Sequence, residues 1–180
     1  MVRRLAEAKN LHLHLDLIAG LPLEGIEQFC RSIDDVMALG AEKVQLGFLK
    51  VLKGSKMREM AEEYGILYRS SAPYEVCQTA QLSGQELTRL HQVEYLLDRT
   101  YNSGLFRHVV DYFGRQTGYA HFYLQLSEQL EREGILPRTL GEKQLAEVLL
   151  GFCQERAQPM AQEMLRLDLL IKKRRPKLPQ

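Results

Sequence analysis

Two histidines and an aspartate stand at alternate positions in the stretch LHLHLDLIAGLP, residues 11–22. Successive side chains of a β-strand point to opposite faces, so His12, His14 and Asp16 share one face and the leucines share the other. Imidazoles bind metal ions or move protons, and a carboxylate accepts hydrogen bonds from a ligand. The spacing therefore indicates a strand with one apolar face and one polar face.

Three interpretations of this polar face follow from the residues alone. In the first, the face lines the lumen of a parallel barrel, where Asp16, nearest the C-terminal end of the strand, contacts a ligand. In the second, His12 and His14 form the metal pair of a barrel metallohydrolase, which needs further ligands from other strands. The other three histidines fall in expected helices of a different region. In the third, this is an edge strand with a solvated polar face and idle histidines.

The elements that would position these residues follow from hydrophobic periodicity. Residues 11–18 predict a strand that ends before Gly20. Apolar positions at helical spacing predict a helix over 24–39 with Gly40 as its C-cap, and KVQLGFLKVL predicts a second strand over 43–52. A connection of this length makes a parallel, right-handed strand–helix–strand unit. Two strands need neighbours or a covering layer to be stable.

The pattern changes from α/β to all-α along the rest of the chain. The expected fold class is therefore a parallel strand–helix–strand unit followed by a helical domain. The domains expected are residues 1–65, a connector over 66–82, and a helical domain with a basic tail over 83–180. The other expected features are helices over 3–9, 56–64, 105–113, 119–133 and 159–171, capping boxes at 83–86 and 139–142, a break at 101–104, and core aromatics over 112–123.

Composition and charge exclude several classes of protein. The 180 residues contain 24 Lys+Arg and 23 Asp+Glu, and this balance argues against a nucleic-acid partner. The dispersed cysteines Cys30, Cys77 and Cys153 form no Cys-x-x-Cys pair, which argues against a disulfide framework and fits a reducing cytosol. No apolar run approaches the ~20 residues of a membrane span, and no signal-peptide core is present. We expect a cytoplasmic protein without a membrane partner.

Several segments resemble one enzyme family in order and spacing. HLDLIAGLPLE and, one helix later, VQLGFLKVLKGSKM resemble the last two strand–helix units of a radical S-adenosylmethionine (SAM) barrel. QLGFLKVLKGS, APYEV, YNSGLF and LRLDLL are similar to signatures of cobalamin-binding-domain-containing radical SAM proteins, whose C-terminal region is a domain of unknown function. The resemblance implies a parent enzyme with a three-cysteine iron–sulfur cluster, an upstream cobalamin domain, and SAM as the source of a 5′-deoxyadenosyl radical.

The resemblance also implies which residues of this chain contact SAM. Asp16 matches an acid that accepts hydrogen bonds from the ribose or the amino group. Gly20 would allow a tight turn and a close approach to the ligand, or it is a plain turn glycine. Gly47 in mid-strand is explained equally by adenine or by helix packing. The full implied set is Asp16, Gly20, Leu21, Pro22, Gln45 and Gly47, with no catalytic or metal-binding residue.

The chain departs from the parent pattern because it has no Cys-x-x-x-Cys-x-x-Cys and only two expected barrel strands. We therefore expect a C-terminal fragment that binds neither cluster nor cobalamin, binds SAM weakly, and does not catalyse alone. Its expected partners are the rest of the parent barrel and, through open strand edges, a second copy. The alternatives are a non-enzymatic module that docks a partner through helices 83–171, and a metallohydrolase using His12 and His14.

Overall fold

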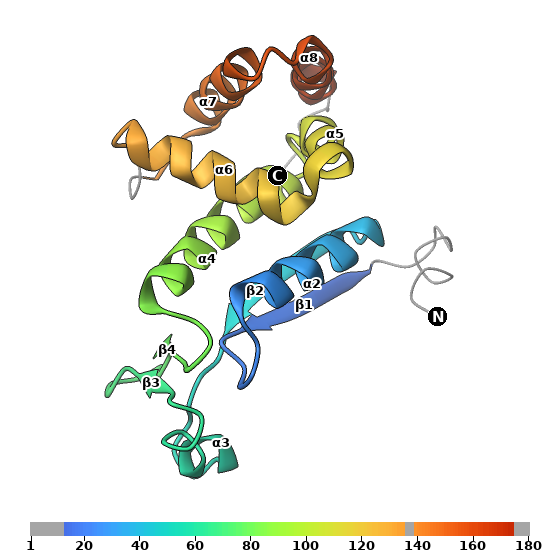
Figure 1. The fold of residues 1–180 in the computed structure, drawn as a ribbon. Helices are drawn as coiled ribbons and strands as arrows, with labels where there is room; N and C mark the ends of the chain where they lie inside the picture. Colours follow the sequence, from blue (N-terminus) through green and yellow to red (C-terminus); the bar gives the residue numbers. More distant parts are fainter. Residues whose placement is uncertain (1–12, 136–138, 175–180) are drawn as a thin grey trace. The chain divides into compact units, whose positions relative to one another are not determined.

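The computed structural model describes residues 13–135 and 139–174 (Figure 1). The expected helix over 3–9, His12 and the end of the basic tail lie outside these ranges. The chain divides into two compact units, Met1–Tyr95 and Leu96–Gln180. Along the described chain, no helix combines the length and apolarity needed to cross a bilayer.

The first unit begins with the expected strand–helix–strand arrangement, formed by β1 (His14–Ala19), α2 (Ile26–Ala38) and β2 (Lys43–Phe48). The strands pair in parallel, from His14 opposite Lys43 to Ala19 opposite Phe48. β2 is shorter than the 43–52 expected. A short parallel sheet followed by helices confirms the fold class at this level of detail.

Helix α2 covers one face of this sheet (Figure 1). Its residues Phe29, Ile33 and Met37 recur at helical spacing and are all buried. On β2, Val44, Leu46 and Phe48 are buried, whereas Lys43 and Gln45 are exposed. The C-cap of α2 is Leu39, one residue before the expected Gly40. Gly40 follows it with φ +71° and donates its N–H to the Met37 carbonyl at 3.1 Å, so the glycine still supplies the left-handed turn that ends the helix.

The segment 66–82, expected as a connector, is an antiparallel hairpin that packs within the first unit. Its strands are β3 (Leu67–Tyr68) and β4 (Val76–Gln78), which follow the short helix α3 (Lys56–Glu59). The Val76 N–H donates to the Leu49 carbonyl at 2.9 Å, and the side chains of Val76 and Leu82 are buried. Strands of two and three residues are too short to produce a periodic signal.

Helix α4 (Gly84–Leu97) starts at the capping box predicted from SGQE. The Ser83 N–H donates to Glu86 Oε2 at 2.8 Å, and the Glu86 N–H donates to Ser83 Oγ at 3.2 Å. A π-helical turn, η1 (Asp98–Asn102), follows directly. Gly104, with φ +68°, ends this segment and confirms the expected break.

The second unit is built from helices α5 (Arg107–Thr117), α6 (Tyr119–Arg132), α7 (Glu142–Glu155) and α8 (Pro159–Arg174). Phe113, Phe122 and Phe152 form an aromatic cluster with ring centroids 5.1–5.4 Å apart. This confirms core packing for Phe113, Tyr119, Phe122 and Tyr123, which are buried, whereas Tyr112 of α5 is only half-buried.

The second predicted capping box was wrong. Helix α7 begins at Glu142, with Gly141 rather than Thr139 at the N-cap position. Gln144 supplies the returning side chain, because its Oε1 accepts a hydrogen bond from the Gly141 N–H at 3.0 Å. The TLGE motif satisfies the sequence rule, but the chain enters the helix two residues later.

Candidate functional site

The uncovered face of the β1–β2 pair brings together the main candidate residues. The strand register sets Asp16 beside Gln45, and Ile18 beside Gly47. The side chains of Asp16 and Gln45 are exposed, and the described residues give neither of them a hydrogen-bond partner. A carboxylate acceptor and an amide that both donates and accepts are therefore free to bind the same ligand.

An apolar surface formed by Ile18 and Gly47 lies next to these polar groups, toward the C-terminal ends of the strands. Ile18 is 47% exposed, although the opposite face of its strand is at least partly buried. A Cβ added at Gly47 would meet nothing closer than the Leu17 carbonyl oxygen at 3.6 Å, so internal packing does not require glycine here. Gly47 lies on the face away from α2, so packing against that helix does not explain it. The glycine leaves a flat surface beside Ile18.

In the loop after β1, glycine at position 20 is needed for a different reason from the expected close approach to a ligand. Gly20 is buried with φ +86°, and a Cβ there would lie 2.7 Å from Val76 Cγ1. The close approach that glycine permits is therefore filled by the Val76 side chain of β4. Leu21 is exposed, Pro22 is half-buried, and Leu23 is 68% exposed. The loop thus presents apolar side chains beyond the end of β1.

Only one histidine of the expected metal pair lies in the described part of the chain. His14 is exposed on the same face as Asp16, beside Lys43, and His12 lies outside the described residues. Within the described ranges, no group of three or more His, Cys, Asp and Glu side chains is placed to hold a metal ion. The metallohydrolase interpretation stays a prediction.

The three cysteines are free thiols. Cys30 lies on α2, Cys77 on β4 and Cys153 on α7, each on a separate element. Burial raises the pKa of the Cys30 thiol to about 11, and burial likewise raises the pKa of Cys153 to about 11. Both groups are therefore protonated thiols at neutral pH.

A second cluster of polar groups lies in the helical unit and was missed by sequence reasoning. Asp168 of α8 is 4% exposed and receives hydrogen bonds from the start of α5, including one from the His108 ring. One signal could have drawn attention to it. That signal is the lone carboxylate of Asp168 among leucines in LRLDLL. Its partner His108 stands two residues after YNSGLF, another of the segments that carry the family resemblance.

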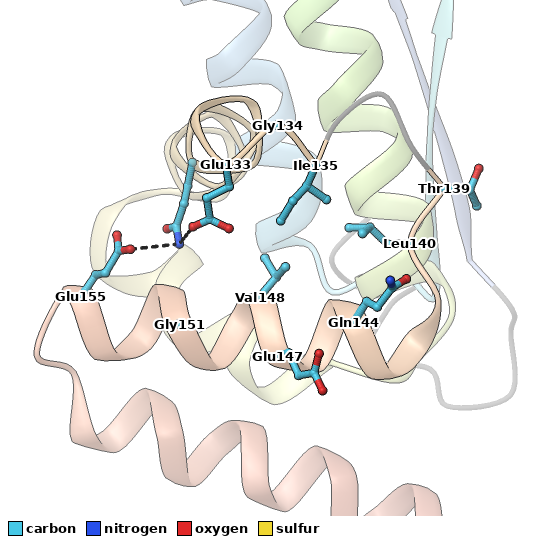
Figure 2. A pocket seen from close by; sticks show the side chains of 11 residues that line it. Glu133, Gly134, Ile135, Thr139, Leu140, Gln144, Glu147, Val148, Gly151 and Glu155 are labelled. Carbon is cyan, nitrogen blue, oxygen red and sulfur yellow. Dashed lines mark hydrogen bonds between the residues drawn. The ribbon is translucent and has the colours of Figure 1, made fainter.

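The helical unit also contains a cavity of about 520 Å³ between the end of α6 and helix α7 (Figure 2). Its buried amide, Gln129, donates to Glu133 Oε1 at 2.9 Å and to Glu155 Oε1 at 3.4 Å. The Gln129 Oε1 accepts a hydrogen bond from Arg156 at 3.3 Å. These groups satisfy one another's hydrogen bonds.

Comparison with known families identifies the second part of the chain. A family described as "Protein of unknown function (DUF4080)" matches residues 62–180. The chain belongs to this family. No curated protein matches the chain. The matched region begins after α3, so it includes the β3–β4 hairpin and the helical unit but not the β1–β2 face. The family description assigns no activity.

Proposed function

We propose that residues 13–52 form the last strand–helix–strand unit of a radical SAM barrel, and that this chain supplies part of a SAM site. The observation that supports this is the uncovered, mixed polar and apolar face of a parallel strand pair. The iron–sulfur cluster of such an enzyme would be held by other residues, because this chain has no Cys-x-x-x-Cys-x-x-Cys motif, and the cobalamin would be held by an upstream domain.

The first support is the incomplete sheet. Among the described residues, β1 and β2 pair only with each other over His14–Ala19 and Lys43–Phe48. Parallel sheets are normally covered on both faces and flanked by further parallel strands. Here α2 covers one face, while Asp16, Ile18 and Gln45 remain exposed on the other. A barrel lumen accounts for a parallel pair with one helix-covered face and one polar face.

The second support is the match between this face and the groups of SAM. Asp16 would accept hydrogen bonds from ribose hydroxyls or the amino group. Gln45 would donate to or accept from the same ligand, and the flat surface at Gly47 and Ile18 would receive the adenine ring. In a complete enzyme, bound SAM supplies the 5′-deoxyadenosyl radical. The residues of this chain bind and orient SAM.

A titration of the chain with SAM, followed by amide chemical shifts in NMR, tests the proposal. Half a site should bind weakly, with a Kd of about 1 mM or higher. We expect shifts at residues 16–18 and 45–47, and we expect Asp16→Asn to reduce them. His14→Gln is the matched control, because His14 shares the face but lies at the other end of β1.

Two results would contradict the proposal. The first is an absence of shifts on this face at millimolar SAM. The second is micromolar binding, which would mean that the chain carries a complete site of its own.

A further inference from the structure

The buried carboxylate of Asp168 holds the start of α5 and one imidazole together. Its Oδ1 accepts hydrogen bonds from the His108 N–H at 3.1 Å and from His108 Nδ1 at 2.7 Å. Its Oδ2 accepts a hydrogen bond from the Val109 N–H at 3.1 Å. The two oxygens therefore receive two backbone donors and one side-chain donor.

This arrangement fixes which nitrogen of His108 carries a proton. A carboxylate that faces two backbone N–H groups acts as an acceptor, so the ring nitrogen beside it must be the donor. In the neutral imidazole, Nδ1 then carries the hydrogen and Nε2 keeps its lone pair. The His108 side chain is 45% exposed, whereas that of Asp168 is 3% exposed. The ring thus bonds to a buried carboxylate on one side and reaches solvent.

Capping of α5 does not by itself explain the pair. Phe106 stands at the N-cap position and gives no side-chain cap, so Asp168 satisfies the free N–H groups instead. The bonds to the N–H groups of His108 and Val109 complete that task. The bond to the imidazole is additional, and it has the orientation that a carboxylate gives to a histidine base.

A cavity of about 300 Å³ opens beside this imidazole, lined by His108, Asp111, Tyr112, Arg115, Gln116 and Met164. Asp111 accepts a hydrogen bond from the Tyr119 hydroxyl at 3.2 Å, and the Tyr112 hydroxyl donates to Gln158 at 2.9 Å. Arg115 is exposed and lies two helical turns after His108, on the same face of α5. Side chains of a helix lean toward its N-terminus, so we expect Arg115 to extend along this cavity toward His108, with Asp111 about one turn from each.

We propose that His108 is a general base for a small anionic molecule whose carboxylate or phosphate binds Arg115. Nε2 takes a proton from water or from a hydroxyl of the ligand, and the oxygen keeps the bonding electron pair. Asp168 is a positioning residue that holds the ring and stabilises the imidazolium formed. The imidazolium then returns its proton to the leaving group or to solvent. This site is independent of the proposed SAM face.

Hydrolysis of activated esters by the full chain tests the base. Water attacks the ester carbonyl as its proton moves to Nε2, and 4-nitrophenolate leaves with the electrons of the broken C–O bond. We expect His108→Gln to lower this rate by about tenfold or more. The matched control is His121→Gln, which removes an exposed histidine of α6 and should leave the rate unchanged. Equal rates for the two variants would overturn the proposal.

The anion requirement is tested with two esters, phenyl acetate and 4-acetoxybenzoate, whose carboxylate cannot reach its own ester group. Relative to its spontaneous hydrolysis, the 4-acetoxybenzoate should react faster, and Arg115→Gln should remove this advantage. Inorganic phosphate and succinate, used as inhibitors, distinguish the two anions, because the stronger inhibitor identifies the preferred group. Overturning results are equal relative rates for both esters in the wild type, or no inhibition by either anion.

The role of Asp168 has a readout that a purely structural role would not change. In ¹⁵N NMR of the neutral protein, His108 should carry its hydrogen on Nδ1, and exposed His121 serves as the reference. Asp168→Asn should shift His108 toward the Nε2–H form and lower the ester rate. If the Asp168→Asn variant does not fold, the tautomer of His108 in the wild-type protein tests the role of Asp168 by itself. A hydrogen on Nε2 instead of Nδ1 would overturn the proposed role.

Discussion

The two units differ in what their polar side chains contact. In the helical unit, Asp168 receives three hydrogen bonds, and the buried hydroxyls of Thr100 and Tyr123 lie 2.9 Å apart. On the β1–β2 face of the first unit, Asp16 and Gln45 are exposed without a partner in the described chain. Polar groups are paired where the core is closed and unpaired where the sheet is incomplete.

The apolar side chains make the same distinction. Phe122 and Phe152 are at most 1% exposed in the helical core. On β1, Leu15 and Leu17 face α2 but remain only partly buried, and Ile18 points to the uncovered face. The helical unit therefore has a closed core of its own. The apolar side chains of β1 are exposed to the degree expected of a surface on which a further element normally packs.

The largest effect should come from opening the aromatic core. Phe122→Ala removes a ring that contacts Phe113 and Phe152, and it should lower the free energy of unfolding by about 3–5 kcal/mol. Leu15→Ala removes a partly buried side chain, and it should cost about 1–2 kcal/mol. Urea titrations followed by circular dichroism measure both. If the two substitutions cost the same, the sheet is as closed as the helical core and the comparison fails.

Two glycines sharpen the contrast. A Cβ at Gly114 would lie 2.3 Å from the Tyr119 ring, whose hydroxyl is bonded to Asp111. Gly114→Ala should therefore cost about 1–3 kcal/mol, because the clash outweighs the gain in helix propensity. Gly47→Ala meets no close atom and should stabilise by about 0.5 kcal/mol. Thermal unfolding of both variants tests this, and a destabilised Gly47→Ala would mean that the face is already filled.

The cap of α4 predicts a smaller effect that depends on pH. The hydrogen bond from the Ser83 N–H lowers the pKa of Glu86, and the Ser83 hydroxyl adds to this. A lowered pKa in the folded state stabilises the protein above the unfolded-state pKa, and this contribution is lost as pH falls through the folded-state value. Glu86→Gln keeps a side-chain oxygen that can accept the hydrogen bonds from Ser83. It should therefore remove the loss of unfolding free energy in acid, and it should lower the free energy of unfolding at pH 7 by less than about 1 kcal/mol.

The measurement is the difference in unfolding free energy between pH 7 and pH 3, compared between wild type and Glu86→Gln. The matched control is Glu62→Gln, which changes an exposed carboxylate in the turn after α3. The difference should shrink for Glu86→Gln and stay constant for Glu62→Gln. Equal shrinkage in both variants would assign the pH dependence to overall charge instead of the cap.

Much of the first unit was predictable from the sequence, because its patterns repeat over whole elements. Alternation over 11–18 and helical spacing over 24–39 fixed β1 and α2. The same alternation predicted that Gln45 and Gly47 share one face of β2, but it did not predict whether that face packs against the helix or points away from it. That side is set by α2, whose Phe29, Ile33 and Met37 cover the opposite face.

The features that were not predictable depend on contacts between distant residues. His108 and Asp168 are 60 positions apart, and no local pattern joins them. Gly20 carried a turn signal, but its need for glycine comes from Val76 in a hairpin too short to be recognised. Thr139 satisfied a capping motif that the backbone does not use. Packing between separate elements decided the first two cases, and the local bond from the Gly141 N–H to Gln144 decided the third.

The smallest effect on stability is expected at the proposed ligand face, where it distinguishes binding residues from packing residues. Asp16→Asn and Gln45→Ala change exposed side chains without partners in the described chain, so each should alter unfolding by less than about 0.5 kcal/mol. The same changes should weaken the response of residues 16–18 and 45–47 to SAM. If Asp16→Asn instead cost 2 kcal/mol or more, Asp16 would support the fold, and its exposure would no longer argue for a ligand.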